Sequence, residues 1–184
     1  MAWCVHIEFS INRSSSAGKL LIGDCDGKIT LVDCNALSMQ TYSIPNNEIE
    51  KVLWAPDQAH NFVVSTDKGT VHLYDSRAKN EIQRVQAHED SVTDLTFSAS
   101  NLLLSACADG NIKIWDLTAN NFKLVDTYSE SNVGRIFAIA SNPDRPLTIA
   151  VGGDSKRKSI EVIDLSKLET GKCERLQETD FPFM

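Results

Sequence analysis

Four short segments with one pattern end in aspartate at nearly regular intervals, and this repeat constrains the fold more than any other feature of the sequence. The segments read KITLVD, TVHLYD, NIKIWD and SIEVID. Their last residues, Asp33, Asp75, Asp116 and Asp164, are 42, 41 and 48 residues apart. Apolar residues alternate with others along each segment, which is the period of a β-strand. A repeat of about forty residues with strands in every copy indicates an array of similar supersecondary units.

A turn that ends in glycine precedes three of these segments. Glycine tolerates the positive φ of a tight hairpin, so we predict two-residue turns at Asp26-Gly27, Lys68-Gly69 and Asp109-Gly110. The strand before each turn is a nearly continuous apolar run, as expected for a central strand covered on both faces. These runs read KLLIG, NFVVS, NLLLS and LTIAVGG.

Two further segments complete each copy. VHIEFS, IEKVLW, VTDLTF and RIFAIA lie upstream, and more polar segments such as EIQRVQ and KLVDTY lie downstream. Four strands per copy at this period are typical of a β-propeller blade. A β-sandwich has no reason to repeat residue types at fixed offsets, and the alternation excludes helical repeats. We therefore predict an all-β propeller of about four consecutive four-stranded blades over residues 1–184, with repeats near 3–44, 45–86, 87–128 and 129–177.

The composition is that of an ordinary globular protein, with 42% hydrophobic and 23% charged residues. No apolar run approaches the roughly 18 residues that a membrane span needs, so we expect a soluble, intracellular chain without membrane contacts. The formal net charge of −7 opposes attraction to nucleic acid phosphates. We therefore expect basic or neutral protein partners and no direct binding of nucleic acid.

Sequence motifs of known catalytic chemistry are missing. The chain contains no G-x-S-x-G, H-E-x-x-H or complete Walker sequence. His6, His60 and His72 lack plausible cysteine or carboxylate partners in the sequence, so we expect them in ordinary surface or core positions. These observations favour a non-catalytic protein.

The cysteines are odd in number and widely spread, without the C-x-x-C pairs of zinc sites. They are Cys4, Cys25, Cys34, Cys107 and Cys173. Reduced thiols fit this pattern best, although Cys25 and Cys34 could face each other across a hairpin as a disulfide or metal pair. We expect no metal centre and no cofactor.

The third copy, AHEDSVTDLTFSASNLLLSACADGNIKIWDL, resembles a repeat of the WD-repeat family. Ala87-His88 stands where that family has Gly-His, and Trp115-Asp116 is its closing dipeptide. The resemblance implies a structural network of His88, Ser105, Asp109 and Trp115, in which Asp109 orients the imidazole and the serine hydroxyl links it to the indole N–H. On this interpretation Trp115 faces a polar side, because its ring carries a donor that needs a partner.

The other copies depart from the family pattern. Val32, Tyr74 and Ile163 occupy the tryptophan position, and no histidine aligns with His88. Lys68 replaces the turn aspartate in the second copy. We therefore expect one complete network, with apolar packing in the other blades.

A narrower resemblance extends over nearly the whole chain. The segments EIEKVLW, VVSTDKGTVHLYDSR, SACADGNIKIWD and GRIFAIASNPDRPLTIAVGG are similar to the C-terminal blades of the periodic tryptophan protein 1 family. This resemblance implies a nuclear, nucleolar scaffold for ribosome biogenesis and ribosomal RNA production, with pre-ribosomal or nucleolar chromatin factors as partners; the cytoplasm is the alternative location. WD propellers usually have seven blades, so we expect a partial or open propeller.

One four-residue segment suggests a different partner. YDSR, Tyr74 to Arg77, resembles the W-D-x-R box by which some WD-repeat proteins dock on an adaptor of cullin-type ubiquitin ligases. In that interpretation Asp75 and Arg77 form the docking contact, and the chain is a substrate receptor or adaptor. The alternative is an arginine that caps the outer turn of a blade.

Overall fold

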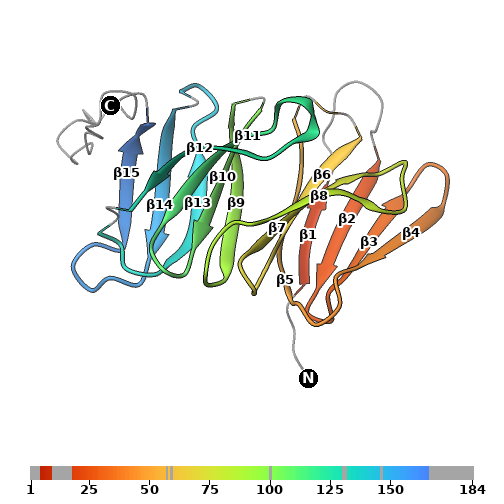
Figure 1. Cartoon of the computed structure of the whole chain (residues 1–184), viewed down its shortest axis with the longest axis horizontal. Coiled ribbons are helices and arrows are strands. Elements are labelled where there is room, and N and C mark those ends of the chain that lie inside the picture. The colour runs from red at the N-terminus through yellow and green to blue at the C-terminus, as the bar shows by residue number, and fades with distance from the viewer. Residues whose placement is uncertain are drawn as a thin grey trace.

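The computed structural model describes residues 5–9, 18–56, 58, 60–99, 101–129, 132–145 and 147–165. Apart from one 3-10 turn, η1 (Thr118–Asn120), the regular elements in these ranges are all β-strands. The strands form four antiparallel sheets in a row, with the first and last sheets at opposite ends of the longest dimension (Figure 1). The predicted all-β, propeller-type array is therefore confirmed. No helix in the described ranges is long and apolar enough to span a membrane.

Each sheet is one blade, and strands that follow one another in the sequence pair within it. Blade 1 contains β1 (Val5–Phe9), β2 (Lys19–Asp24), β3 (Lys28–Asp33) and β4 (Ser38–Ser43). Blade 2 contains β5 (Ile49–Trp54), β6 (Asn61–Thr66), β7 (Thr70–Asp75) and β8 (Glu81–Gln86). Blade 3 contains β9 (Val92–Ala99), β10 (Leu102–Cys107), β11 (Ile112–Asp116) and β12 (Lys123–Tyr128). Blade 4 contains β13 (Ile136–Ser141), β14 (Thr148–Gly153) and β15 (Ile160–Asp164); the position of its predicted fourth strand lies outside the described residues.

The predicted two-residue hairpin turns are wrong, because each connection contains three or four residues. Residues 25–27 connect β2 to β3, residues 67–69 connect β6 to β7, and residues 108–111 connect β10 to β11. In the second of these loops Gly69 N donates to Thr66 O at 3.2 Å, and Gly69 has a φ of +77°. This is the longer hairpin loop in which a turn is followed by a left-handed residue. A Cβ on Gly69 would lie 2.1 Å from the carbonyl oxygen of His88, so the close approach also requires glycine.

The apolar core lies between the blades, because each sheet packs its face against the face of the next sheet. Three clusters of buried side chains fill these interfaces. Members from facing blades include Leu21 with Phe62, Val63 with Leu103, and Ile112 with Ile149. Alternate residues of one strand therefore enter different clusters, as Phe62 and Val63 do.

The second strands of the inner blades are buried on both faces, as their apolar sequences predict. All six residues of β6 are buried, as are five of the six in β10. The same expectation is wrong for β2 and β14, where the buried positions are interrupted by partly exposed ones and, at Ala150 of β14, by an exposed one. These two strands belong to the outer blades, which have a neighbouring blade on one side only within the described residues.

Polar contacts also join the innermost strands of adjacent blades. Lys51 Nζ of β5 lies 3.0 Å from Asp94 Oδ1 of β9. The other oxygen of Asp94, Oδ2, accepts a hydrogen bond from Ile139 N of β13 at 3.0 Å. Asp94 is buried and so links blades 2, 3 and 4 at their inner edge.

Candidate functional site

Three of the four residues of the predicted network meet in the interface between blades 2 and 3. Ser105 Oγ lies 2.8 Å from His88 Nε2 and accepts a hydrogen bond from Trp115 Nε1 at 2.9 Å. Pairing of β10 with β11 sets Leu103 opposite Trp115, which places the indole beside the serine two residues further along β10. All three polar side chains are at most 4% exposed, so each hydrogen bond satisfies groups that would be costly to bury alone.

The expectation that Trp115 faces a polar side is wrong. Its ring belongs to the apolar cluster that contains Val63 and Leu73 of blade 2. It also meets the Phe122 ring edge-on, with centroids 6.2 Å apart and planes at 78°. Ile112 and Ile114 point the other way, into the cluster shared with blade 4. Alternate residues of β11 therefore enter two different buried interfaces. On the side that faces blade 2, the indole N–H is a buried donor that needs a hydrogen-bond acceptor, which Ser105 provides.

Asp109 lies near this network without a hydrogen bond to the imidazole. Within the described part of the chain His88 Nδ1 is buried and has no hydrogen-bond partner, and Asp109 Oδ1 accepts from Asn111 N at 2.8 Å. Burial lowers the pKa of His88 to about 4, opposed by the nearby Asp109 carboxylate and reinforced by Lys113. Burial alone would raise the pKa of Asp109, but hydrogen bonds from Asn111 and Cys107 bring it below its ordinary value. The imidazole is therefore neutral at neutral pH.

The same hairpin brings together one set of donor atoms of the kinds that hold transition metals. Among the described residues, a ring nitrogen of His88, the Cys107 sulfur and a carboxylate oxygen of Asp109 all lie within 4.8 Å of one another. Nitrogen, sulfur and oxygen donors are the ligands of zinc in proteins. Cys107 Sγ accepts a hydrogen bond from Asp109 N at 3.4 Å, and burial raises the pKa of its thiol to about 12. The thiol is thus protonated as long as it binds no metal.

The described cysteines form no disulfide. Cys25, Cys34 and Cys107 all carry reduced sulfur, so the Cys25–Cys34 hairpin disulfide, considered as an alternative, does not form. Cys4 and Cys173 lie outside the described residues.

The adaptor-like segment forms a closed ion pair at the end of β7. Arg77 Nη2 lies 2.6 Å from Asp75 Oδ2, and Arg77 Nε lies 3.0 Å from Asp75 Oδ1. Arg77 N also donates to Asp75 Oδ1 at 2.8 Å, which fixes the turn that follows the strand. The arginine hydrogen bonds hold the pKa of Asp75 below its ordinary value. The Arg77 side chain is 66% exposed, so it is accessible to a partner although it is already paired.

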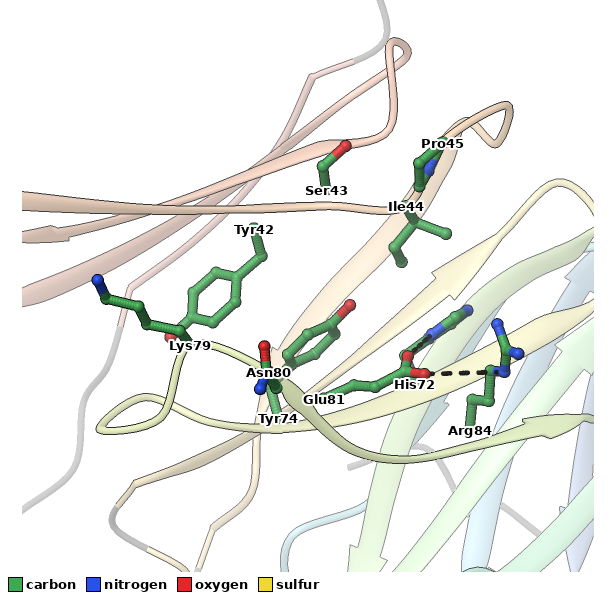
Figure 2. A pocket seen from close by; sticks show the side chains of 10 residues that line it. All are labelled: Tyr42, Ser43, Ile44, Pro45, His72, Tyr74, Lys79, Asn80, Glu81 and Arg84. Atoms are coloured by element: carbon green, nitrogen blue, oxygen red, sulfur yellow. Dashed lines mark hydrogen bonds and ion pairs between the residues drawn. The ribbon is translucent and has the colours of Figure 1, made fainter.

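A cleft that the sequence did not indicate opens between the outer strands of blades 1 and 2 (Figure 2). It has a volume of about 390 Å³. Tyr42 of β4 lines one wall, and Tyr74 and His72 of β7 line the other. Lys79 and Arg84 bring positive charge to it and Glu81 brings a carboxylate, so the cleft combines aromatic surface with charged groups of both signs.

The expectation that His72 lacks a carboxylate partner is wrong. His72 Nδ1 lies 2.7 Å from Glu81 Oε2, and His72 Nε2 lies 2.9 Å from Thr70 Oγ1. Burial lowers the pKa of His72, and the Glu81 carboxylate opposes that shift. Glu81 is nine residues away in the sequence, and the pairing of β7 with β8 brings the two together. Only knowledge of that register could have revealed the pair.

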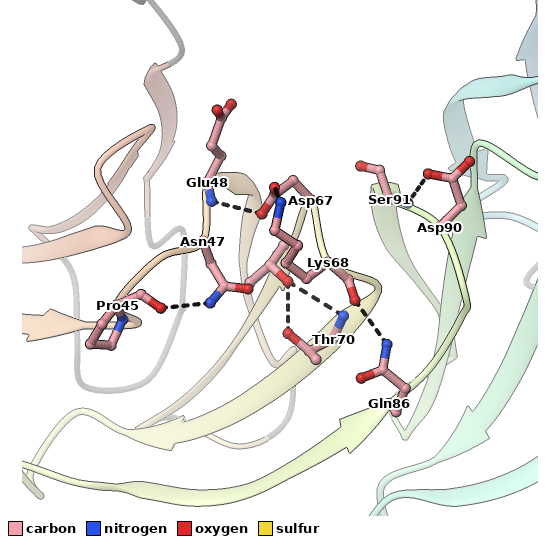
Figure 3. Close-up of polar contacts among 10 residues, drawn as sticks. Pro45, Asn47, Glu48, Asp67, Lys68, Thr70, Gln86, Asp90 and Ser91 are labelled. Carbon is pink, nitrogen blue, oxygen red and sulfur yellow. Dashed lines mark hydrogen bonds and ion pairs between the residues drawn. The ribbon is translucent and has the colours of Figure 1, made fainter.

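The hairpin-turn end of blade 2 is acidic and well ordered by hydrogen bonds (Figure 3). Asp67 accepts from Glu48 N at 2.8 Å through Oδ1 and from Lys68 Nζ at 2.5 Å through Oδ2. Burial raises the pKa of Glu50, and the nearby Asp67 and Glu48 carboxylates add to that shift. Asp90 stands on the neighbouring loop and accepts from Ser91 N at 2.8 Å. This end of the array thus carries several carboxylates on fixed loops.

Comparison with known proteins relates the chain to WD-repeat proteins. The family "WD domain, G-beta repeat" matches residues 79–116. A periodic tryptophan protein 1 homolog of Drosophila melanogaster is 34% identical over 145 residues, which are 75% of this chain and 31% of that protein. A guanine nucleotide-binding protein subunit beta of Zea mays is 30% identical, over 73% of this chain and 38% of that protein. A DDB1- and CUL4-associated factor 11 homolog of Caenorhabditis elegans is 28% identical, over 68% of this chain and 24% of that protein.

A solved structure has the same fold. A chain in a crystal structure of a mitotic checkpoint complex superposes with a TM-score of 0.72 at 21% identity, over 91% of this chain and 48% of that chain. The present chain therefore spans less than half the length of these relatives and of this structure.

Proposed function

Since this chain is built of WD-type propeller blades, we propose that it is a non-catalytic platform for protein partners in ribosome biogenesis or ribosomal RNA production in the nucleolus. The observation that carries the proposal is its similarity to the periodic tryptophan protein 1 homolog, which extends over three quarters of the chain. We extend the proposal to a nuclear, nucleolar location, which the same similarity supports. Partners of this class are pre-ribosomal proteins and nucleolar chromatin factors.

The rigid array supports the role of a platform. Loops held by packed sheets present side chains to partners at little conformational cost. The turn end of blade 2 presents the carboxylates of Glu48, Asp67 and Asp90 on such loops. Its acidity, together with the net charge of −7, favours a basic protein partner and disfavours bare nucleic acid.

A second candidate function is docking to an adaptor of cullin-type ubiquitin ligases. The exposed Arg77 at the end of β7 and the similarity to a DDB1- and CUL4-associated factor 11 homolog favour it. In this case Arg77 has to exchange Asp75 for a partner, because the two are already joined by a bidentate contact. Because the Asp75–Arg77 contact has to break, the docking contact adds less to the binding free energy than a free arginine would.

Affinity purification of the tagged chain from cells, with imaging of its location, tests both functions. We expect nucleolar signal and recovery of pre-ribosomal or ribosomal RNA synthesis factors. Glu48→Lys together with Asp90→Lys reverses charge at the turn end and is expected to reduce that recovery several-fold. If these substitutions leave the recovery of pre-ribosomal factors unchanged, the turn end of blade 2 does not bind these partners.

Two arginines of blade 2 separate the candidate functions. Arg77→Ala removes the adaptor-like contact, whereas Arg84→Ala removes an equally exposed guanidinium that lies 3.7 Å from Glu81. We expect neither substitution to change recovery of pre-ribosomal factors. Recovery of ubiquitin-ligase adaptor components alone, lost in Arg77→Ala and kept in Arg84→Ala, would replace the first function by the second.

A further inference from the structure

One cluster of polar side chains beside the β10–β11 loop has no role in the proposed platform. It consists of His88, Cys107 and Asp109, whose donor atoms all lie within 4.8 Å of one another. His88 lies in the loop before β9, whereas Cys107 ends β10 and Asp109 lies in the loop between β10 and β11. The fold therefore brings together three potential metal ligands from two separate segments.

The imidazole of His88 has one ring nitrogen available to a ligand. Its Nε2 lies 2.8 Å from Ser105 Oγ, whereas its buried Nδ1 has no hydrogen-bond partner among the described residues. Because a serine oxygen has two lone pairs, Ser105 can accept from both His88 Nε2 and Trp115 Nε1. An Nε2–H donated to Ser105 leaves a lone pair on Nδ1, which is the form of histidine that binds a metal. The residue is only 3% exposed, and an unsatisfied buried nitrogen of this kind is typical of a site for an ion.

The sulfur of Cys107 is held in place by the loop that follows it. Cys107 Sγ accepts a hydrogen bond from Asp109 N at 3.4 Å, and Cys107 O accepts one from Gly110 N at 3.1 Å. The side chain is fully buried. A hydrogen bond from a backbone N–H stabilises the negative charge that a sulfur acquires when a metal displaces its proton. The loop is thus already shaped to support a thiolate ligand.

Asp109 supplies an oxygen ligand and a route from solvent. It is exposed, unlike the other two residues of the cluster, so an ion can enter from its side. A thiolate and a carboxylate together balance the charge of a divalent cation. Lys113 lies close enough to influence His88 and opposes a cation there, but its Nζ is held by Ala87 O at 2.6 Å.

We propose that His88 Nδ1, Cys107 Sγ and a carboxylate oxygen of Asp109 bind a zinc ion, with water in the fourth position. Zinc bonds are about 2.0 to 2.3 Å long, so tetrahedral ligand atoms lie about 3.3 to 3.6 Å apart. Since the three donors are at most 4.8 Å apart, a small movement of the exposed Asp109 side chain completes the site. The ion takes the place of the thiol proton that Cys107 donates to Asp109, and that proton passes to solvent.

This site differs from our expectation of a chain without a metal centre. That expectation depended on the lack of C-x-x-C pairs, whereas here the fold joins a histidine to a cysteine and an aspartate that lie 19 and 21 residues further along the chain. The bound ion connects the loop that leads out of blade 2 to the β10–β11 loop of blade 3. Zinc therefore binds the folded chain in preference to the unfolded chain and stabilises it.

Titration of the full chain with Co²⁺, in a reductant that does not bind metals, tests the sulfur ligand. We expect one equivalent to give the d–d bands of a tetrahedral site and a thiolate-to-cobalt charge-transfer band, both lost when zinc displaces the cobalt. Cys107→Ser should abolish the charge-transfer band. The matched control replaces the remaining cysteines by serine and should keep the band; they are Cys4, Cys25, Cys34 and Cys173. A band that persists in Cys107→Ser, or is lost in the control, would overturn the proposal.

Zinc affinity, measured by competition with a chromophoric chelator, tests the other two ligands. We expect a Kd of about 1 μM or lower for the parent chain. His88→Gln and Asp109→Asn should each weaken it at least about tenfold, and Asp109→Asn is an isosteric change at an exposed position that leaves the fold intact. Asp26→Asn, in the corresponding loop of blade 1, is the matched control and should bind zinc as the parent does. Zinc should also raise the melting temperature of the parent chain more than that of Asp109→Asn. Equal affinities of the parent and Asp109→Asn, or a Kd above about 100 μM for the parent, would refute the zinc site.

Discussion

The hydroxyl of Ser105 accepts the indole N–H of Trp115 at 2.9 Å inside the apolar interface of blades 2 and 3. Trp54, in the interface of blades 1 and 2, is also buried, but its Nε1 has no hydrogen-bond partner among the described residues. The two tryptophans therefore differ in one respect that can be measured. One indole N–H is satisfied inside the protein and the other is not.

Replacement of each tryptophan by phenylalanine measures this difference. We expect Trp115→Phe to lower the free energy of unfolding by about 1 to 3 kcal/mol, because it leaves the buried Ser105 hydroxyl short of a partner. Trp54→Phe should cost less, since it removes an unpaired buried donor together with part of the ring. Urea unfolding followed by circular dichroism gives both values. Equal costs would show that the indole hydrogen bond contributes nothing measurable.

Protonation of His88 is expected to lower the free energy of unfolding as the pH decreases. Burial lowers the pKa of His88 from 6.5 to about 4, so the unfolded chain binds a proton at a higher pH than the folded chain does. The stabilisation is complete above pH 6.5 and is lost as the pH falls from 6.5 towards 4. Its size is about 3 kcal/mol at most, by the linkage of pKa to stability.

His88→Gln isolates this effect, because glutamine retains a hydrogen-bonding side chain but does not titrate. His6 and His72 also have lowered pKa values and contribute to the same pH window in both proteins. The difference in unfolding free energy between the parent chain and the variant should therefore shrink as the pH falls from 7.5 to 4.5. Parallel pH profiles would contradict the assignment to His88.

Gly23 is expected to tolerate no side chain, because blade 2 fills its space. Gly23→Ala would bring a Cβ to 2.4 Å from Ile49, so we expect a loss of about 1 to 3 kcal/mol from overpacking. Gly152→Ala, at the same register position but with open space around it, should change stability by less than about 0.5 kcal/mol. Thermal unfolding of the two variants provides the comparison. Similar melting temperatures would argue against tight packing of blades 1 and 2.

Loss of Asp94 is expected to destabilise the fold more than loss of the exposed Asp75–Arg77 ion pair of blade 2. Asp94→Ala removes the partner of Lys51 and of Ile139 N at once, and we expect a loss of roughly 2 to 4 kcal/mol. Arg77→Ala breaks an ion pair whose arginine is largely in water and should cost under about 0.5 kcal/mol. Chemical denaturation of both variants tests the order. A smaller loss for Asp94→Ala than for Arg77→Ala would reverse it.

The strands and their order were predictable from the sequence because they depend on local alternation and on a repeat that is visible in the residues themselves. The closing aspartates fix the register of each hairpin, as the pairing of Lys19 with Asp33 and of Thr148 with Asp164 shows. Loop length was less predictable. Asp26-Gly27 suits a two-residue turn, which would require β2 to continue to Cys25. The strand ends at Asp24 instead, so residues 25–27 all belong to the loop.

The environment of each face was not predictable from one blade alone. The alternation of Trp115 with Ile114 would be the same if the Trp115 side of the sheet faced water or another sheet. The packing of blade 2 on that side is what buries Trp115. The pair of His72 with Glu81 depends on the register of β7 with β8, which no motif marks. The missing hydrogen bond between the buried His88 Nδ1 and Asp109 depends on the distance between side chains beside the loop of residues 108–111, which is longer than the predicted turn.

The placement of the apolar clusters between sheets also determines what can fold by itself. Each of the two inner blades contributes its apolar side chains to two different clusters, so in isolation it would have two uncovered faces and no interior. Two adjacent blades are then the smallest cooperative unit, and stability grows with the number of interfaces, as in a one-dimensional chain of coupled units. Local opening should start at an outer blade and spread inwards, and amide hydrogen exchange should therefore be slowest in β6 and β10.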